Sequence, residues 1–292
     1  MNGKRRERIF NGVNGTILGI LLLLFFLPFW LILVTSLSEN NRLQVEGVSL
    51  WFKGFSLAGY SFLFEMSDIF FRSLWFSFWT TTLSAVIACT VCLFAAYALS
   101  KKYLTGGKFF NVFFMLTMFL YGGQIPVYLV IRNIGLYDTA WAFILPGTAG
   151  AYNIMLIRNY FYGMSSSLEE AARLDGASDT DILLRIFLPL SLPIIFSVFL
   201  MHFVAKWNAW LPSLLYVGAQ NQKLWTAQYV LNQMITDAQA LFGTSGSGSV
   251  SLAPLIAAKN AGVVIVILPL LVISPMVQKF FVRGIVGGAV KG

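Results

Sequence analysis

Long apolar stretches alternate with short polar segments along most of this chain. Six windows of about 20 residues carry no charged side chain, and this is the length that an α-helix needs to cross the hydrocarbon core of a bilayer. The pattern predicts an all-α polytopic membrane protein with six transmembrane helices. The windows are residues 9–38, 73–100, 109–131, 139–157, 186–205 and 260–278.

The composition agrees with a membrane protein. Of the 292 residues, 58% are hydrophobic and 11% are charged, whereas soluble domains have about 25% charged residues. The net charge of +8 does not indicate nucleic acid, because cytoplasmic loops of membrane proteins collect Lys and Arg. With the N-terminus inside, most Lys and Arg fall on inner segments, so we expect both termini in the cytoplasm. The first apolar run is too long for a signal peptide, so we expect it to stay as the first span.

One long polar segment, residues 165–189, interrupts the apolar pattern between the fourth and fifth windows. It predicts two short helices with a sharp turn at Gly176, where a left-handed residue would end the first helix. Ser178 with Asp181 is expected to cap the second helix, which should end before Pro189. At the start of the first helix two capping boxes are expected, Ser166 with Glu169 and Ser167 with Glu170.

The spacing within this segment resembles the EAA loop of ABC-importer permeases. Glu170-Ala171-Ala172 is followed in register by Gly176, Ile186 and Leu188-Pro189. Residues 95–101, AAYALSK, resemble the start of the conserved permease core. The glycine-rich C-terminus resembles that of the maltose-type second permease subunit, and residues 122–135 and 206–210 resemble the branch that handles oligosaccharides or polysaccharide fragments.

The resemblance implies a permease subunit of an ATP-driven, binding-protein-dependent sugar importer of the bacterial cell membrane. Such a subunit forms half of the translocation pathway and is not an enzyme. The chain has no G-x-x-x-x-G-K-[ST] pattern, so ATP and Mg²⁺ are expected on a partner. The implied partners are an ABC ATPase dimer, a second permease subunit in a heterodimer, an extracytoplasmic solute-binding protein, the sugar and membrane lipid.

We expect one permease domain over residues 1–292. It would comprise a first span with an outer segment (1–68), a five-span core (69–285) and a cytoplasmic tail (286–292). The outer loop 217–259 is either a contact for the binding protein or, around its Gly/Ser run 243–249, a flexible connector.

The resemblance assigns the contact with the ATPase to the coupling helix in residues 165–189. Glu169 and Glu170 would hold this loop by capping and by charge contacts, the two alanines would permit close packing, and Gly176 would supply the turn. The expected coupling residues are Glu169, Glu170, Ala171, Ala172, Asp175, Gly176, Ala177 and Pro189.

Two further segments are candidates for the substrate path. Gly122-Gly123 before Pro126 predicts a broken helix, which is tolerated at membrane depth only beside protein or a water-filled cavity; a packing kink is the alternative. His202 and Lys206 share a helix face, but Lys206 lies about 25 Å along the helix from Pro189 at 1.5 Å per residue. An outer vestibule or interface role is therefore favoured, and for His202 a helix–helix hydrogen bond. The candidates are Tyr121, Gln124, Tyr128, His202, Lys206, Trp207 and Asn208.

Two other functions stay open at this point. An ion-coupled secondary transporter would carry intramembrane acidic residues, and the six windows contain no Asp or Glu. An ABC permease for a non-sugar solute would share the same loop. A metal site is not expected, because Cys89 and Cys92 stand alone with a single His.

Overall fold

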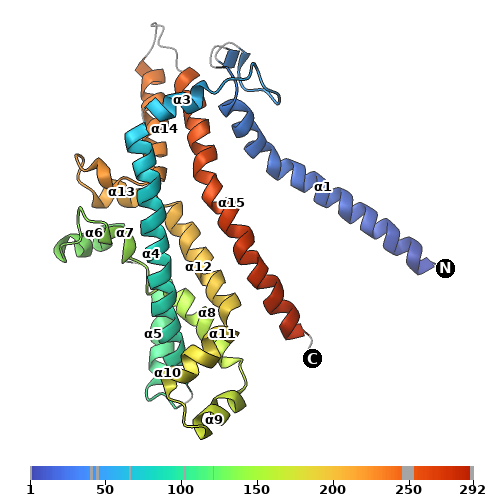
Figure 1. Ribbon diagram of the computed structural model, residues 1–292, viewed down its shortest axis with the longest axis vertical. Helices are drawn as coiled ribbons and strands as arrows, with labels where there is room; N and C mark the ends of the chain where they lie inside the picture. Colours follow the sequence, from blue (N-terminus) through green and yellow to red (C-terminus); the bar gives the residue numbers. More distant parts are fainter. Residues whose placement is uncertain are drawn as a thin grey trace. The chain divides into compact units, whose positions relative to one another are not determined.

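The structure is a computed structural model, and it describes residues 2–39, 42–43, 46–65, 67–101, 103–120, 122–244 and 253–289. Within these residues the regular structure is helical, apart from one isolated antiparallel bridge between Ser38 and Phe55. The predicted all-α class is therefore confirmed for the described part of the chain (Figure 1). Tyr121 and most of the Gly/Ser run lie outside the described residues.

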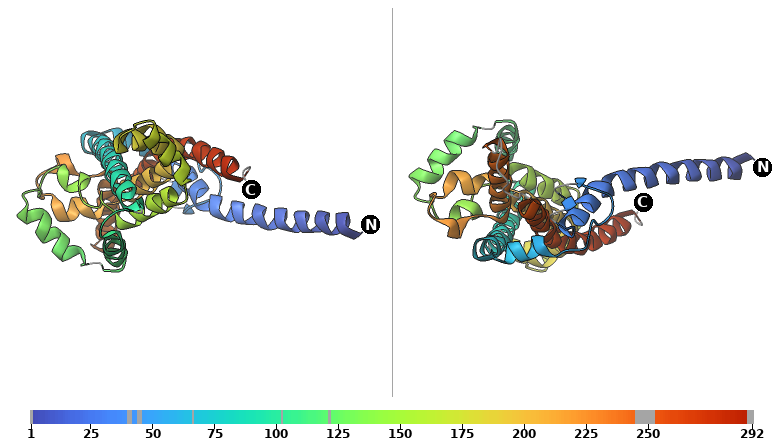
Figure 2. Two further views of the ribbon diagram at one scale, coloured as in Figure 1. Left: turned by 90° about the horizontal axis from the view of Figure 1, so that it is seen from below. Right: turned by 90° about the horizontal axis from the view of Figure 1, so that it is seen from above.

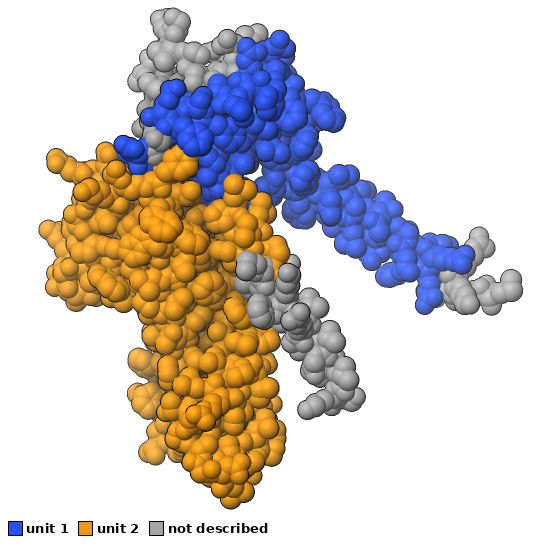
Figure 3. Space-filling view, in the orientation of Figure 1, with its two compact units in different colours: residues 1–70, 231–267 blue, residues 71–230, 268–292 orange. Residues whose placement is uncertain are grey.

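The chain divides into two compact units (Figure 3). Unit 1 contains residues 1–70 and 231–267, and unit 2 contains residues 71–230 and 268–292. Unit 1 includes α1 (Asn2–Ser36), α3 (Ala58–Glu65) and parts of three helices that continue into unit 2: α4 (Ser67–Ser100), α14 (Ala227–Thr244) and α15 (Ala253–Ala289).

Small residues permit close backbone approach inside unit 1. A Cβ atom added at Gly59 would lie 2.7 Å from the backbone carbonyl carbon of Ala257. The last residue of α1, Ser36, is linked to α3 by a hydrogen bond between its hydroxyl and that of Tyr60, 3.1 Å apart. The apolar side chains of α1, by contrast, are largely exposed, as expected of a helix that faces lipid or another subunit.

Unit 2 holds the polar loop and its supports. Figure 1 shows α9 and α10 at one end of this unit, and Figures 1 and 2 show α6, α7 and α13 grouped together elsewhere on it. A π-helical turn (Leu183–Phe187) and a 3₁₀ turn (Gln222–Leu224) complete its regular structure. Its other helices are α5 (Gly107–Phe119), α6 (Gln124–Asn133), α7 (Trp141–Ile144), α8 (Ala151–Tyr162), α9 (Ser166–Leu174), α10 (Asp179–Ile182), α11 (Leu188–Leu190), α12 (Leu192–Trp207) and α13 (Leu211–Tyr216).

Three described helical segments are long and apolar enough to cross a membrane: Glu7–Ser36, Asp68–Ser100 and Ile256–Pro275. Two bent pairs, α5 with α6 and Asp179–Leu190 with α12, raise this number to five if each pair is one span. The remaining expected span, the fourth in chain order (residues 139–157), is divided into α7 and α8 around Pro146 and Gly147, and Gly147 has a φ of 81°.

The second helix of the polar loop was predicted to end before Pro189, and this is wrong. The chain stays helical through the π turn and α11, and the break falls at Ser191 instead. Proline is tolerated in the first turn of a helix, where its missing N–H has no partner to lose, and Pro189 stands in the first turn of α11. The wide π turn before it absorbs the change in register.

A hydrophobic cluster fastens the polar loop to the long helices of unit 2. Ala172 of α9 and Ile182 of α10 are buried with residues of α4 and α8. Tyr97, Phe161 and Phe187 meet edge to face, with ring centroids 5.3–6.2 Å apart. The loop is therefore anchored to α4 and α8 through its own buried residues.

Candidate functional site

The turn between α9 and α10 is built by backbone hydrogen bonds around Gly176. Gly176 has a φ of 80°, as predicted. Ala177 N–H donates to the Ala172 carbonyl (3.0 Å) and Gly176 N–H to the Arg173 carbonyl (3.1 Å), which together form a Schellman motif. Because only glycine adopts this conformation without a steric penalty, the residue type is dictated by the turn.

Of the N-terminal caps predicted for the two loop helices, the one of α10 is confirmed and the one of α9 is not. Ser178 caps α10 as predicted, accepting a hydrogen bond from Asp181 N–H (3.2 Å). The capping boxes at the start of α9 are wrong: the N-cap is Ser165, one residue before Ser166 and two before Ser167, and it makes no side-chain cap. The Glu169 carboxylate, expected to bind backbone N–H, binds Lys101 and Arg173 instead.

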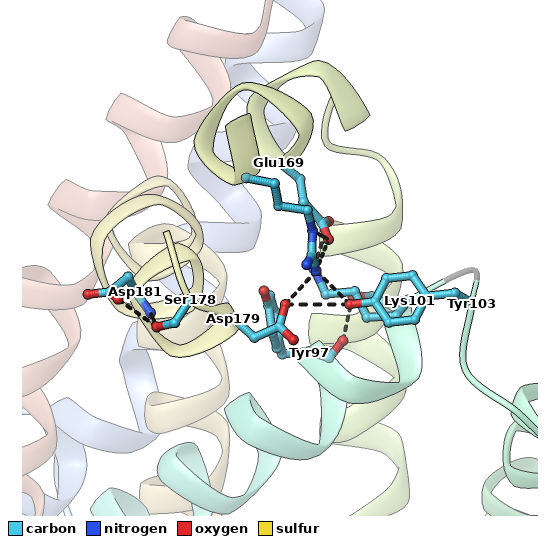
Figure 4. A network of polar contacts seen from close by, with 9 residues as sticks. Tyr97, Lys101, Tyr103, Glu169, Ser178, Asp179 and Asp181 are labelled. Atoms are coloured by element: carbon cyan, nitrogen blue, oxygen red, sulfur yellow. Dashed lines mark hydrogen bonds and ion pairs between the residues drawn. The ribbon is translucent and has the colours of Figure 1, made fainter. Parts of the chain in front are cut away.

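Glu169 is the centre of an ion-pair network that joins α9 to the end of α4 (Figure 4). Lys101 Nζ lies 2.7 Å from one carboxylate oxygen, and Arg173 Nη2 lies 2.9 Å from the other. Arg173 also pairs with Asp179 and donates to the Tyr103 hydroxyl (2.7 Å). The network therefore connects α4, α9 and the start of α10.

The Lys101–Glu169 pair is largely shielded from water. The two side chains are only 7% and 18% exposed, and Lys101 Nζ also lies 3.8 Å from the centroid of the Tyr97 ring. Partial burial raises the pKa of Glu169, but hydrogen bonds and charge from Lys101 and Arg173 outweigh it, so the pKa falls below its ordinary value. Glu169 is thus held as a carboxylate.

The rest of the motif is presented to the outside. Glu170, Ala171, Asp175, Gly176 and Pro189 are exposed, whereas Ala172 is buried and Ala177 half-buried. Leu174, the last residue of α9, is 90% exposed. An apolar side chain held out beside an exposed carboxylate is typical of a surface that contacts a partner.

The candidate path residues near the helix break are exposed or half-buried. The predicted break is confirmed: α5 ends at Phe119, α6 starts at Gln124, and Gly123 has a φ of 89°. Gln124 is exposed. Tyr128 is half-buried beside Tyr137 (ring centroids 6.3 Å apart), and its hydroxyl accepts a hydrogen bond from Arg132.

His202 and Lys206 both contact carbonyl groups at the end of α7 and just after it, Lys206 directly and His202 through the Ser84 hydroxyl. Lys206 Nζ donates to the carbonyls of Phe143 (2.8 Å) and Pro146 (2.6 Å). Ser84 Oγ donates to the Ile144 carbonyl (2.7 Å), which leaves His202 Nε2 as the donor to Ser84 Oγ (3.0 Å). These side chains satisfy carbonyls that the broken helix leaves without an intrahelical donor.

The last two path candidates differ in exposure. Trp207 is 1% exposed and stacks on Phe203, with ring centroids 5.8 Å apart. Asn208 is exposed and accepts a hydrogen bond from Gln228 (3.3 Å). Among the path candidates, Gln124 and Asn208 are therefore exposed, whereas His202, Lys206 and Trp207 are engaged in contacts with neighbouring segments.

Sequence reasoning missed Lys101, Arg173 and Leu174 as functional candidates. Lys101 is the last residue of the AAYALSK run, for which the sequence indicates a family resemblance but no role. Arg173 follows Glu169 at i+4, a spacing at which opposite charges pair on a helix. No local signal marks Leu174, because its exposure depends on how α9 packs. The described residues contain no group of three or more His, Cys, Asp or Glu that could hold a metal.

These features define an integral membrane protein whose long apolar helices carry a polar helical loop. The model of the family "Binding-protein-dependent transport system inner membrane component" matches residues 107–287. The chain belongs to this family, and it is a non-catalytic permease subunit of an importer.

Curated relatives match over almost the whole chain. The polygalacturonan/rhamnogalacturonan transport system permease protein YtcP of Bacillus subtilis is 33% identical, covering 98% of this chain and 100% of the relative. Protein LplC of Bacillus subtilis is also 33% identical, covering 100% and 98%.

A solved structure agrees with the fold. One chain of a bacterial ABC transporter involved in the import of the acidic polysaccharide alginate is 29% identical, with a TM-score of 0.82 over 95% of this chain and 98% of that chain.

Proposed function

We propose that this chain forms half of the translocation pathway of an ATP-driven importer of oligosaccharides or polysaccharide fragments. In this proposal the chain docks on a separate ATPase dimer through residues 165–189. The observation that carries the proposal is the α9–α10 turn. Its hydrogen bonds and buried residues fix one side of the EAA-like motif to the chain's own core, and the other side of the motif is exposed. The relatives' names support a carbohydrate as the substrate.

The proposed docking surface consists of Glu170, Ala171, Leu174 and Asp175. Leu174 would enter an apolar pocket of the ATPase, while Glu170 would pair with a basic residue there. Next to α9 a cavity of about 530 Å³, lined in part by Tyr162, Ser166 and Glu170, leaves room for a side chain of the partner. Ala172 and Glu169 face the chain's own core and ion pairs, so their role in coupling is to hold α9 on α4.

The topology is part of the same proposal. Six spans result if α7 with α8 is one broken span and each bent pair is another, and both termini are then cytoplasmic together with the docking surface. The whole chain acts as a single permease domain that transmits movement from α9 to the helices around the path. A second, related permease subunit and an extracytoplasmic solute-binding protein complete the importer.

For the path, Gln124, Tyr128 and Asn208 are the proposed sugar contacts. Amide groups and aromatic rings at the surface suit the hydroxyls and faces of sugar rings. His202 and Lys206 act as positioning residues, since their polar atoms already bind Ser84 and two carbonyls. Tyr121 stays a candidate outside the described residues.

The test is a tagged purification from native membranes in mild detergent, combined with uptake of labelled oligosaccharides. Wild-type protein should retain an ATPase and a second permease subunit, and cells should take up an oligogalacturonide or a neutral oligosaccharide. Leu174→Asp should lose the ATPase but keep the second permease. Leu168→Asp, which alters another exposed leucine of α9 (43% exposed), is the matched control. Purification of the chain alone, without any ATPase, would contradict the proposal.

A further inference from the structure

A second cavity, which the proposed docking surface does not use, lies between the end of α4, the start of α5 and α8. Its volume is about 480 Å³. Lys101, Lys108 and Arg158 contribute to its lining, together with Gly107, Asn111 and Tyr162. None of the described residues that line it is acidic. We call it the basic cavity.

The two cations that are not used by the ion-pair network lack a counter-charge. Lys101 is paired with Glu169, but no ion pair of Lys108 or Arg158 occurs among the described residues. Arg158 donates to the Leu99 carbonyl (3.4 Å) and lies 5.1 Å from the centroid of the Tyr162 ring. Its guanidinium is thus oriented by neutral groups and keeps its charge available for an anion.

The start of α5 adds backbone donors to the same cavity. The helix begins at Gly107 after Gly106, which has a φ of 76°. Gly107 N–H donates to the Leu104 carbonyl (3.0 Å), whereas no side chain caps the next two N–H groups, of Lys108 and Phe109. The first turn has no acidic residue, and Lys108 stands there although a cation is unfavourable at the positive end of the helix dipole. An anion in the cavity would satisfy both the free N–H groups and Lys108.

The apolar surface that continues from the cavity indicates an amphiphilic anion. Along α5, Phe109, Phe113 and Leu116 are 68%, 51% and 52% exposed, so acyl chains have an apolar helix face to lie on. Asn111 also lines the cavity, and its Oδ1 is buried without a hydrogen-bond donor among the described residues. A headgroup hydroxyl would supply that donor.

We propose that the basic cavity binds the headgroup of an anionic phospholipid, with the phosphodiester between the side chains of Lys108 and Arg158 and the backbone N–H groups of Lys108 and Phe109. A glycerol headgroup fits best, because its hydroxyls can donate to Asn111. Basic pockets between membrane helices are a known means of recognising such headgroups. The bound lipid would fix the α4–α5 connection beside the Lys101–Glu169 pair.

The test is native mass spectrometry of the full-length protein, exchanged in detergent with phosphatidylglycerol, phosphatidylcholine or inorganic phosphate. Wild type should retain phosphatidylglycerol and not phosphatidylcholine, and excess inorganic phosphate should not displace it. Lys108→Gln should weaken retention about fivefold, as should Arg158→Gln, on the basis of the usual contribution of one basic residue.

Two features keep this test decisive. Lys108 is exposed, so its variant should fold even if Arg158→Gln does not. Arg185→Gln removes an exposed cation outside the cavity and should leave retention unchanged. Equal retention of both lipids, full displacement by inorganic phosphate, or wild-type retention by Lys108→Gln would overturn the proposal.

Discussion

The Lys101–Glu169 ion pair offers a prediction in which the two partners are not equivalent. Glu169→Gln leaves the almost buried ammonium of Lys101 without a negatively charged partner. The rings of Tyr97 and Phe187, 3.8 and 4.8 Å away, still stabilise it. Losing one partner of a buried pair costs about 3–5 kcal/mol, and the cation–π contacts return about 1 kcal/mol. We expect a net loss of about 3 kcal/mol.

Lys101→Met is expected to cost less. Glu169 keeps Arg173 as a partner at 2.9 Å, and methionine retains the apolar contact with the Tyr97 ring. The loss is then one charge-assisted hydrogen bond, about 1.5 kcal/mol. In the double variant neither charge is left alone, so its cost should be smaller than the sum of the two single costs.

Hydrogen exchange of the α9 backbone amides in detergent micelles measures this difference. Since 1.4 kcal/mol corresponds to tenfold, α9 should exchange about 100-fold faster in Glu169→Gln and about tenfold faster in Lys101→Met. The amides of α12 serve as the internal control and should be unchanged. A larger effect for Lys101→Met than for Glu169→Gln, or additive costs in the double variant, would refute this reasoning.

Three further predictions follow from the same geometry. Gly176→Val, strained by about 1–2 kcal/mol at a φ of 80°, should uncouple ATP hydrolysis from sugar uptake. Gly176→Asn should retain uptake, because asparagine tolerates this conformation. Normal uptake by the valine variant would contradict this prediction. Lys206→Met removes the donor to the Phe143 and Pro146 carbonyls and should destabilise the protein by about 1–3 kcal/mol in thermal unfolding, with an unchanged melting temperature as the opposing result. Because the folded-state pKa of Glu169 is lowered, its stabilisation of α9 is fully present above the ordinary Glu pKa of about 4.3 and is lost as the pH falls through the folded value; exchange of α9, corrected for the intrinsic rate, should show this loss in wild type and much less of it in Glu169→Gln.

Local signals in the sequence predicted the turn of the loop but not its contacts. Gly176 and the Ser178 cap were predictable because glycine and serine act on backbone groups within a few residues. The helix break at Gly122-Gly123 was predictable for the same reason. Helical structure through Pro189 was not, because it depends on a π turn that no residue type marks.

Contacts over long sequence separations account for the rest. Glu169 fits a capping box by spacing, but its carboxylate binds Lys101, 68 positions earlier in the chain. Lys206 carried a signal as a charged residue near the end of a span, yet its acceptors, 63 and 60 positions away, are known only once α7 and α8 are placed beside α12. The exposure of Leu174 likewise follows from the burial of Ala172 on the other side of α9.

The most direct test of the proposed coupling is site-specific photo-cross-linking in native membranes. A benzophenone amino acid at Leu174 should yield an adduct with the nucleotide-binding subunit, whereas the same residue at Leu116, on the exposed apolar face of α5, should not. Mass spectrometry of the adduct identifies the partner. Absence of an ATPase adduct at Leu174 in cells that still import the sugar would contradict the proposed docking surface.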